Sequence, residues 1–140
     1  MTGMTADEIN AFLRDGFPGG GNPPTVERAD GRVAVCRMRY DDRQLRPGGT
    51  LSGPTMMALA DTVVYALIFS AIGFSPLSVT TNLSINFLRK PGPADLIAEA
   101  RTLKRGKALF VADVIIRSDG DDGPCAHAVV TYSIPPAKSA

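Results

Sequence analysis

The sequence predicts an α+β fold, in which helices and strands occupy separate stretches of the chain rather than alternating along it. The stretch from Leu51 to Gly73 is long and apolar and carries one charged residue, Asp61. The stretch from Leu77 to Arg89 alternates apolar and polar residues, as a strand with one buried face does. Turn residues then separate three further strand-like segments. A chain of 140 residues is expected to form one domain, residues 1–140, with a central helix against an antiparallel sheet of five to six strands.

Composition and charge argue against several functional classes. Hydrophobic residues make up 44% of the chain and charged residues 21%, which argues against extensive disorder. The net charge of +1 argues against a nucleic-acid-binding protein, which needs a strong basic excess. Cys36, Cys125 and the single His127 lack metal-ligand spacing, so we expect two buried, reduced thiols and no metal. No signal-peptide pattern is present at the N-terminus, and a cytoplasmic location is expected.

The first third of the chain is predicted to contain a short helix and two strands. Thr5 and Glu8 have the spacing of a capping box, which predicts a helix over about 5–14. Strands are expected over 25–29 and 33–40, joined by an Asp-Gly dipeptide that favours a tight hairpin. The polar, turn-rich segment that follows leads the chain into the apolar stretch.

The apolar stretch is predicted to be a buried helix. Ser52 suits the N-cap, Pro54 suits the first helical position and Gly73 suits the C-terminal stop. A helix from about Pro54 to Ala71 would be about 27 Å long, which reaches the length of a membrane span. The charge of Asp61 near its centre and the lack of flanking Lys or Arg favour a core helix instead, and no membrane association is expected.

The second half of the chain is predicted to be an antiparallel meander of three to four strands. Strands are expected over 77–89, 96–103, 108–117 and 124–134. In the first of these, strict alternation would turn the apolar side chains to one face. It would place Thr80 and Asn82 together on the polar face.

Asp61 is the most informative residue, because a lone carboxylate in an apolar run is costly to bury unless it is paired or used. One alternative is a structural acid hydrogen-bonded to Thr62, Ser84 or backbone groups across an interface. The other is a catalytic acid. Residue types alone leave both open.

The order of elements and the motif around Asp61 resemble the hotdog-fold acyl-CoA thioesterases, and more narrowly the branch that includes the phenylacetate-pathway thioesterases. The family pattern is His-Gly-Gly, an apolar stretch, and an acid eight residues after the first Gly. The matching residues are Ser52-Gly53-Pro54, TMMALA and Asp61-Thr62, and VTTNLSINFLRKPGP is similar to the strand that follows. The resemblance covers roughly residues 25–134. The chain departs from the pattern at Ser52, at Pro54, and at Arg46, which stands near the place of an Asn in many relatives.

The resemblance implies an enzyme that hydrolyses a CoA thioester to a carboxylate and free CoA, without a cofactor. Asp61 would be the general base or the nucleophile, Gly53 would bind the carbonyl oxygen through the helix N-terminus, and Thr80 would hold the attacking water. An acyl or aryl group would lie beside Met56, Met57, Tyr65 and Phe69. The candidate substrate-binding residues, whose basic members would meet the CoA phosphates, are Arg46, Ser52, Pro54, Thr62, Asn82, Arg89, Lys90, Arg105 and Lys107.

The spacing of Gly53 and Asp61 predicts a homodimer. Eight helical residues span about 12 Å, too far for one thioester group to touch both. The site would combine Gly53 of one protomer with Asp61 of another, in agreement with the dimeric family, and dimers are expected to pair into a homotetramer. The departures at Ser52, Pro54 and Arg46 leave open a non-catalytic acyl-CoA-binding hotdog protein. A hotdog hydratase or dehydratase would need a better placed histidine than His127.

Overall fold

The computed structural model describes residues 3–16, 23–41, 45–46 and 50–136. Within these ranges the chain forms one short helix, one long helix and eight strands. In chain order they are α1 (Ala6–Gly16), β1 (Thr25–Ala29), β2 (Val33–Met38), β3 (Leu45–Arg46), β4 (Thr50–Leu51), α2 (Gly53–Ile72), β5 (Val79–Phe87), β6 (Leu96–Arg105), β7 (Leu109–Ser118) and β8 (Pro124–Ser133).

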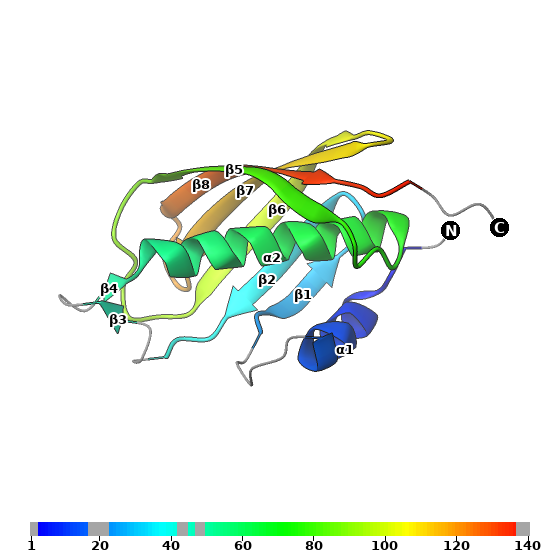
Figure 1. Cartoon of the computed structure of the whole chain (residues 1–140). Coiled ribbons are helices and arrows are strands. Elements are labelled where there is room, and N and C mark those ends of the chain that lie inside the picture. Colours follow the sequence, from blue (N-terminus) through cyan, green and yellow to red (C-terminus); the bar gives the residue numbers. More distant parts are fainter. Residues whose placement is uncertain (1–2, 17–22, 42–44, 47–49, 137–140) are drawn as a thin grey trace.

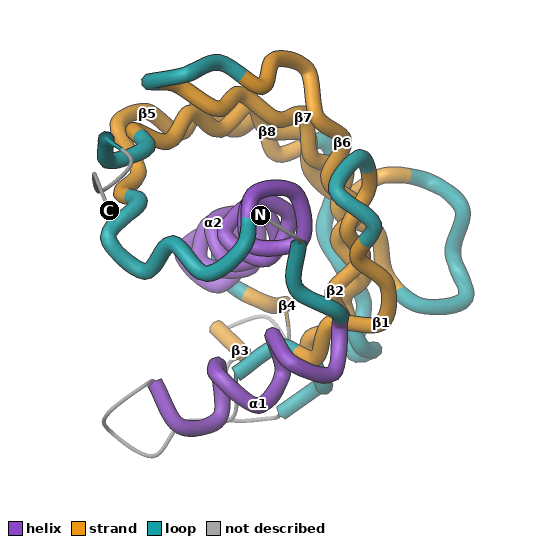
Figure 2. Tube along the Cα trace, turned by 90° about the vertical axis from the view of Figure 1, so that its right-hand side faces the viewer, coloured by secondary structure: helices purple, strands orange, loops and turns teal. Residues whose placement is uncertain are grey.

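Six of the strands form one antiparallel sheet in the order β1-β2-β6-β7-β8-β5. The sheet curves around α2, which crosses its concave face, and α1 lies near the β1 edge (Figures 1 and 2). This α+β architecture is the predicted hotdog fold. Strands β3 and β4 form a separate short ribbon beside the start of α2, in a segment that was expected to be turns.

Strands β6, β7 and β8 form a three-stranded meander, but β5 does not belong to it. After α2 the chain enters the edge of the sheet opposite β1 and pairs with β8, so the connection from β5 to β6 passes strands β8 and β7. The predicted meander of three to four strands therefore has three, and β5 lies outside it. Because β5 is an edge strand, one side of its backbone has no partner strand among the described residues.

The N-terminal helix begins with the predicted capping box. The backbone N–H of Glu8 donates to Thr5 Oγ1 at 3.2 Å, and the N–H of Thr5 donates to Glu8 Oε1 at 3.0 Å. The side-chain amide of Asn10 then exchanges two hydrogen bonds with the Val26 backbone, at 2.7 and 2.9 Å. These bonds fix α1 to the exposed edge of β1 and cover part of it.

The β1–β2 hairpin turns at Asp30 and Gly31, as predicted. Gly31 has a φ of +83°, a backbone conformation that glycine adopts without strain. Asp30 Oδ1 accepts from the backbone N–H groups of Arg32 and Val33, at 3.0 and 2.8 Å. The carboxylate thus replaces backbone partners that the tight turn cannot supply.

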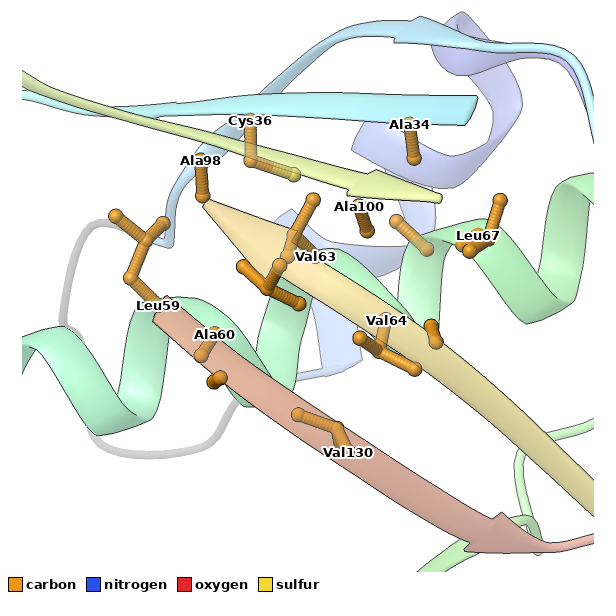
Figure 3. Close-up of a cluster of buried hydrophobic side chains, with 14 of the residues drawn as sticks. Ala34, Cys36, Leu59, Ala60, Val63, Val64, Leu67, Ala98, Ala100 and Val130 are labelled. Atoms are coloured by element: carbon orange, nitrogen blue, oxygen red, sulfur yellow. The ribbon is translucent and has the colours of Figure 1, made fainter. Parts of the chain in front are cut away.

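Helix α2 begins at Gly53, with Ser52 as N-cap, and ends at Gly73, whose φ is +93°. By length and mean hydropathy, 1.8, it could span a membrane, but most of its apolar window is buried inside the molecule. Its side chains meet small inward-facing residues of the sheet, which let helix and strands approach closely (Figure 3). The labelled core residues are Ala34, Cys36, Leu59, Ala60, Val63, Val64, Leu67, Ala98, Ala100 and Val130. The apolar stretch is the core helix that its composition predicted.

Candidate functional site

A pocket of about 350 Å³ opens beside the middle of α2, where α1, α2, β5 and β8 meet. Its lining combines one carboxylate, several hydroxyl groups and three aromatic side chains, which come from α1, α2 and β8. The lining residues are Phe12, Asp61, Thr62, Tyr65, Ser78, Val79, Thr80 and Tyr132. Asp61, Thr62 and Thr80, all singled out from the sequence, therefore lie in one pocket.

The carboxylate of Asp61 is held by two hydroxyl groups on the same oxygen. Thr80 Oγ1 donates to Asp61 Oδ1 at 2.5 Å, and the Tyr132 hydroxyl lies 2.8 Å from the same atom. The Tyr132 hydroxyl also lies 3.0 Å from the backbone carbonyl oxygen of Asp61. Two hydroxyl groups from different strands thus orient the carboxylate.

A β-bulge in β5 brings Thr80 to Asp61. Thr80 pairs with Tyr132 of β8, but Asn82 pairs with Thr131, so one residue of β5 is inserted between them. Paired residues share a sheet face, so Thr80 turns inward with Tyr132 while Asn82 turns outward. Asn82 accepts from Ser84 at 3.4 Å on the outer face, away from the pocket. The expectation that Thr80 and Asn82 share a face is wrong because of this bulge.

Tyr132 is a site residue that the sequence did not reveal. Its side chain is 3% exposed, and its ring stacks on Tyr65 with 6.0 Å between ring centroids. Burial, followed by the negative charge of Asp61, raises the pKa of Tyr132 well above its usual value, so the phenol keeps its proton. The available signal was its position in the inward-facing register of β8, because a buried tyrosine needs a partner for its hydroxyl.

The apolar wall of the pocket is aromatic and comes partly from α1. Phe12 lies 5.4 Å from Phe69 and 5.2 Å from Phe74, measured between ring centroids. Tyr65, with its hydroxyl bonded to the carbonyl oxygen of Pro76 at 3.0 Å, completes the wall. Phe69 is fully buried behind these rings. Of the side chains predicted beside the acyl group, Tyr65 alone lines this pocket.

The two methionines of that prediction lie elsewhere. Met56 is buried in the core, and Met57 is 40% exposed on α2 outside the pocket lining. Phe12, Ser78 and Val79 line the pocket instead, and nothing in the sequence assigned them to it. Phe12 belongs to the apolar face of α1, and a sequence pattern cannot say which part of the fold that face covers.

The N-terminus of α2 is a separate locus on the same helix. Ser52 Oγ accepts from the Thr55 N–H at 3.3 Å and lies 2.9 Å from Thr55 Oγ1, so the side chain of Ser52 acts as the helix cap. The ring of Phe87 covers Gly53 so closely that a Cβ there would lie 3.1 Å from Phe87 Cζ. Pro54 occupies the second helical position, without a backbone N–H.

The candidate basic residues fall at two ends of the sheet. Arg89 follows β5 near the α2 N-terminus and pairs with Asp121, and exposed Lys90 is next to it. Exposed Arg105 ends β6 and exposed Lys107 lies in the β6–β7 turn, which is at the Tyr132 end of the sheet. A single protomer thus has cations near each of its two loci.

Three other candidates lie in different surroundings. Thr62 lines the pocket, but its hydroxyl donates to the Ala58 carbonyl oxygen at 2.9 Å. Arg46 pairs with Thr50 in the β3–β4 ribbon, and its side chain lies outside the described part of the structure. His127 contacts Asp113 on the outer face of the sheet, away from the pocket. Among the described residues, no group of three or more His, Cys, Asp or Glu is placed to hold a metal ion.

The two cysteines are buried and free, and they lie outside the pocket lining. Burial, with a smaller contribution from the charge of Glu27, raises the pKa of Cys36 to about 12. A thiol with so high a pKa is a poor nucleophile near neutral pH. Cys36 is therefore a core residue rather than a catalytic one.

Comparison with known proteins identifies the family. The model of the thioesterase superfamily matches residues 48–125, which include the α2 N-terminus, Asp61 and Thr80. A structure from Silicibacter sp. TM1040, described as a "putative thioesterase", is 41% identical over 97% of this chain and 95% of its own, with a TM-score of 0.88.

Two more distant structures share the fold. Zebra fish thioesterase superfamily member 2 is 22% identical over 94% of this chain and 99% of its own, with a TM-score of 0.81. A Streptococcus mutans protein bound to acetyl CoA is 18% identical over 88% of this chain and 96% of its own, with a TM-score of 0.75. The protein therefore belongs to the thioesterase superfamily and is a thioester hydrolase with the hotdog fold.

Proposed function

We propose that the protein is an acyl-CoA thioesterase whose sites lie at a homodimer interface. The observation that carries this proposal is Asp61, a carboxylate oriented by Thr80 and Tyr132 at the wall of a pocket large enough for an acyl group. A carboxylate with a purely structural role would not need an open pocket beside it. The acetyl CoA bound by the Streptococcus mutans relative supports a CoA thioester as the substrate class.

The chemistry follows from the pocket. The Asp61 carboxylate takes a proton from water while the water oxygen bonds to the thioester carbonyl carbon. Negative charge then develops on the carbonyl oxygen, where a backbone N–H at a helix N-terminus stabilises it. The carbon–sulfur bond breaks, the electron pair leaves with sulfur, and the thiolate takes the proton from Asp61. Direct attack by Asp61 through an anhydride gives the same carboxylate and free thiol.

The second half of the site is proposed to come from a partner protomer. Gly53 is the residue at the α2 N-terminus, and it lies about 12 Å along the helix from Asp61. Strand β5 supports a dimer, because it is a sheet edge with exposed apolar residues along and beyond it. These residues are Leu77, Val79, Phe87 and Leu88. Pairing β5 with its copy would join two sheets and set the two α2 helices antiparallel.

The basic residues are proposed to bind the phosphate groups of CoA. Lys90, Arg105 and Lys107 are exposed, whereas Arg89 already has Asp121 as a partner. In a β5-paired dimer, Arg105 and Lys107 would lie beside the pocket of their own protomer. The partner's Lys90 would lie on the other side of the same site, near the partner's Gly53. A dimer of dimers, a cytoplasmic location and catalysis without a cofactor complete the proposal.

Free-thiol release from a panel of short, long and aryl CoA thioesters tests the proposal. The wild type is expected to release CoA from at least one class, and Asp61→Asn to lower kcat by about 100- to 10,000-fold, the usual contribution of a general base. The asparagine Oδ1 can still accept from Thr80 and Tyr132, so folding is retained. Asp113→Asn is the matched control, because Asp113 is another partly buried carboxylate outside the pocket. Tight binding of CoA esters without thiol release would instead favour an acyl-CoA-binding protein.

A further inference from the structure

We infer that Tyr132 is a positioning residue for Asp61: together with Thr80 it fixes Asp61 Oδ1, so that Oδ2 is the oxygen left for chemistry. The inference rests on the proposed function. It assigns a role to a side chain from β8. The family model ends at residue 125 and so covers only the first residues of this strand. The inference also divides the two oxygens of one carboxylate between two tasks.

The hydrogen bonds of Asp61 are unequally distributed. Oδ1 accepts from Thr80 at 2.5 Å and from Tyr132 at 2.8 Å, whereas no described residue donates to Oδ2. A carboxylate oxygen with two donors is poorly disposed to accept a third proton or to attack a carbonyl carbon. Rotation of the carboxylate about its χ2 angle would break both bonds. The two hydroxyls therefore keep Oδ2 in one place.

Tyr132 is suited to this role because it cannot move easily. It lies within β8, between the neighbouring strand positions of Thr80 and Phe110, and its ring stacks on Tyr65. Its hydroxyl also lies 3.0 Å from the backbone carbonyl oxygen of Asp61, so it holds the carboxylate in a fixed position relative to the α2 backbone. A phenol with a raised pKa remains a donor throughout the neutral and alkaline range in which a thioesterase is assayed.

The role predicts a specific kinetic signature. Tyr132→Phe keeps the ring and its stacking on Tyr65 and removes only the hydroxyl. We expect kcat to fall by about 10- to 100-fold, because a misdirected reacting group loses rate in this range. KM is expected to stay near the wild-type value, since the hydroxyl faces Asp61 rather than the acyl group. A buried tyrosine also needs a partner for its own stability, so a loss of stability alone would not establish the role.

Ser70→Ala is the matched control. Ser70 is a buried hydroxyl on α2, the helix that also carries Asp61, and it lies outside the pocket lining; it donates to the Leu67 carbonyl oxygen at 2.8 Å and accepts from the Gly31 N–H at 3.0 Å. It should lower the thermal unfolding midpoint as Tyr132→Phe does, with kcat unchanged. Equal losses of kcat in the two variants would overturn the inference, because the effect would then follow stability.

A double-mutant cycle supplies the second measurement. If Thr80 and Tyr132 act through the same oxygen, Thr80→Val and Tyr132→Phe together should cost less in kcat than the product of their separate effects. Multiplicative losses would show independent roles and overturn the shared anchoring of Oδ1. If the wild type and Ser70→Ala release no thiol from any ester, the proposed function itself has failed. If both are active and Tyr132→Phe keeps its kcat, only the role of Tyr132 has failed.

Discussion

A site shared between protomers can be tested by restoring activity from two inactive variants. The first variant is Asp61→Asn, which removes the carboxylate. The second is Gly53→Pro, which removes the backbone N–H of Gly53 and leaves a residue suited to the first helical position. Ser52 precedes it with φ −79° and ψ 156°, the extended backbone that a following proline requires. Loss of one such donor is expected to lower kcat by about 100- to 1,000-fold.

The expected recovery follows from the geometry. In a mixed dimer of the proposed arrangement, Gly53 of the Asp61→Asn protomer would face Asp61 of the other protomer, and this site would be intact. The second site carries both changes. Random exchange of equal amounts makes about half of the dimers mixed, each with one intact site of two, so about one quarter of the wild-type kcat per protomer should return. If each site used Gly53 and Asp61 of the same chain, the mixture would stay as inactive as its parents.

Native mass spectrometry and thiol release on one sample make the result decisive. Gly53→Ala is the matched control, because it adds a Cβ against the half-exposed Phe87 ring but keeps the N–H. It should retain far more activity than Gly53→Pro. Mixed dimers at the expected abundance, with activity no higher than the sum of the two parents, would refute the shared site.

Three further predictions concern the fold and the pocket. Leu67→Ala, in the core, should lower the free energy of unfolding by about 2–5 kcal/mol in urea titrations, whereas Met57→Ala on the exposed face should change it little. Phe12→Ala should raise KM for bulky acyl or aryl esters and leave acetyl CoA unaffected; equal changes for all esters would contradict a role of Phe12 in the acyl pocket. Hydrogen bonds from the Val33 and Arg32 N–H groups lower the pKa of Asp30, so its stabilisation is present above the ordinary aspartate pKa and is lost as pH falls through the lowered value. Urea midpoints of the wild type and Asp30→Ala should differ at neutral pH and converge as pH falls through the lowered pKa of Asp30.

Local patterns predicted the elements of this fold because their causes are local. The Thr5–Glu8 capping box, the Asp30 turn and the cap at Ser52 each depend on hydrogen bonds between residues at most three positions apart. The pairing of β5 with β8 depends on contacts between residues 39 to 54 positions apart, which periodicity does not encode. Alternation correctly predicted that Leu83 faces inward. Leu83 lies beyond the bulge, where the pattern is undisturbed, and it packs against the core.

The site was only partly predictable for the same reason. Asp61 could be singled out from the sequence because it is the one charged residue in the apolar stretch. Burying its carboxylate is costly, and the stretch itself offers no residue of opposite charge to pair with it. The bulge that turns Thr80 inward leaves no mark in an alternating strand, since one inserted residue changes the face without changing composition. Tyr132 belongs to a strand whose inward-facing residues could be predicted from the alternation, but the hydrogen bond of Tyr132 to Asp61 could not. Contacts between side chains of different elements can be predicted only once the order of the strands in the sheet is known.

The departures from the family pattern now have a physical consequence. In the first turn of α2, Pro54 has no N–H, Thr55 donates to Ser52 Oγ, and Met56 donates to the Ser52 carbonyl oxygen. Among the described residues, this leaves Gly53 as the first-turn N–H without an acceptor. A pattern with a second glycine in place of Pro54 would offer two neighbouring donors to a carbonyl oxygen. In the proposed site this chain would offer one, so its rate should depend on Gly53 more steeply than in a relative with two glycines.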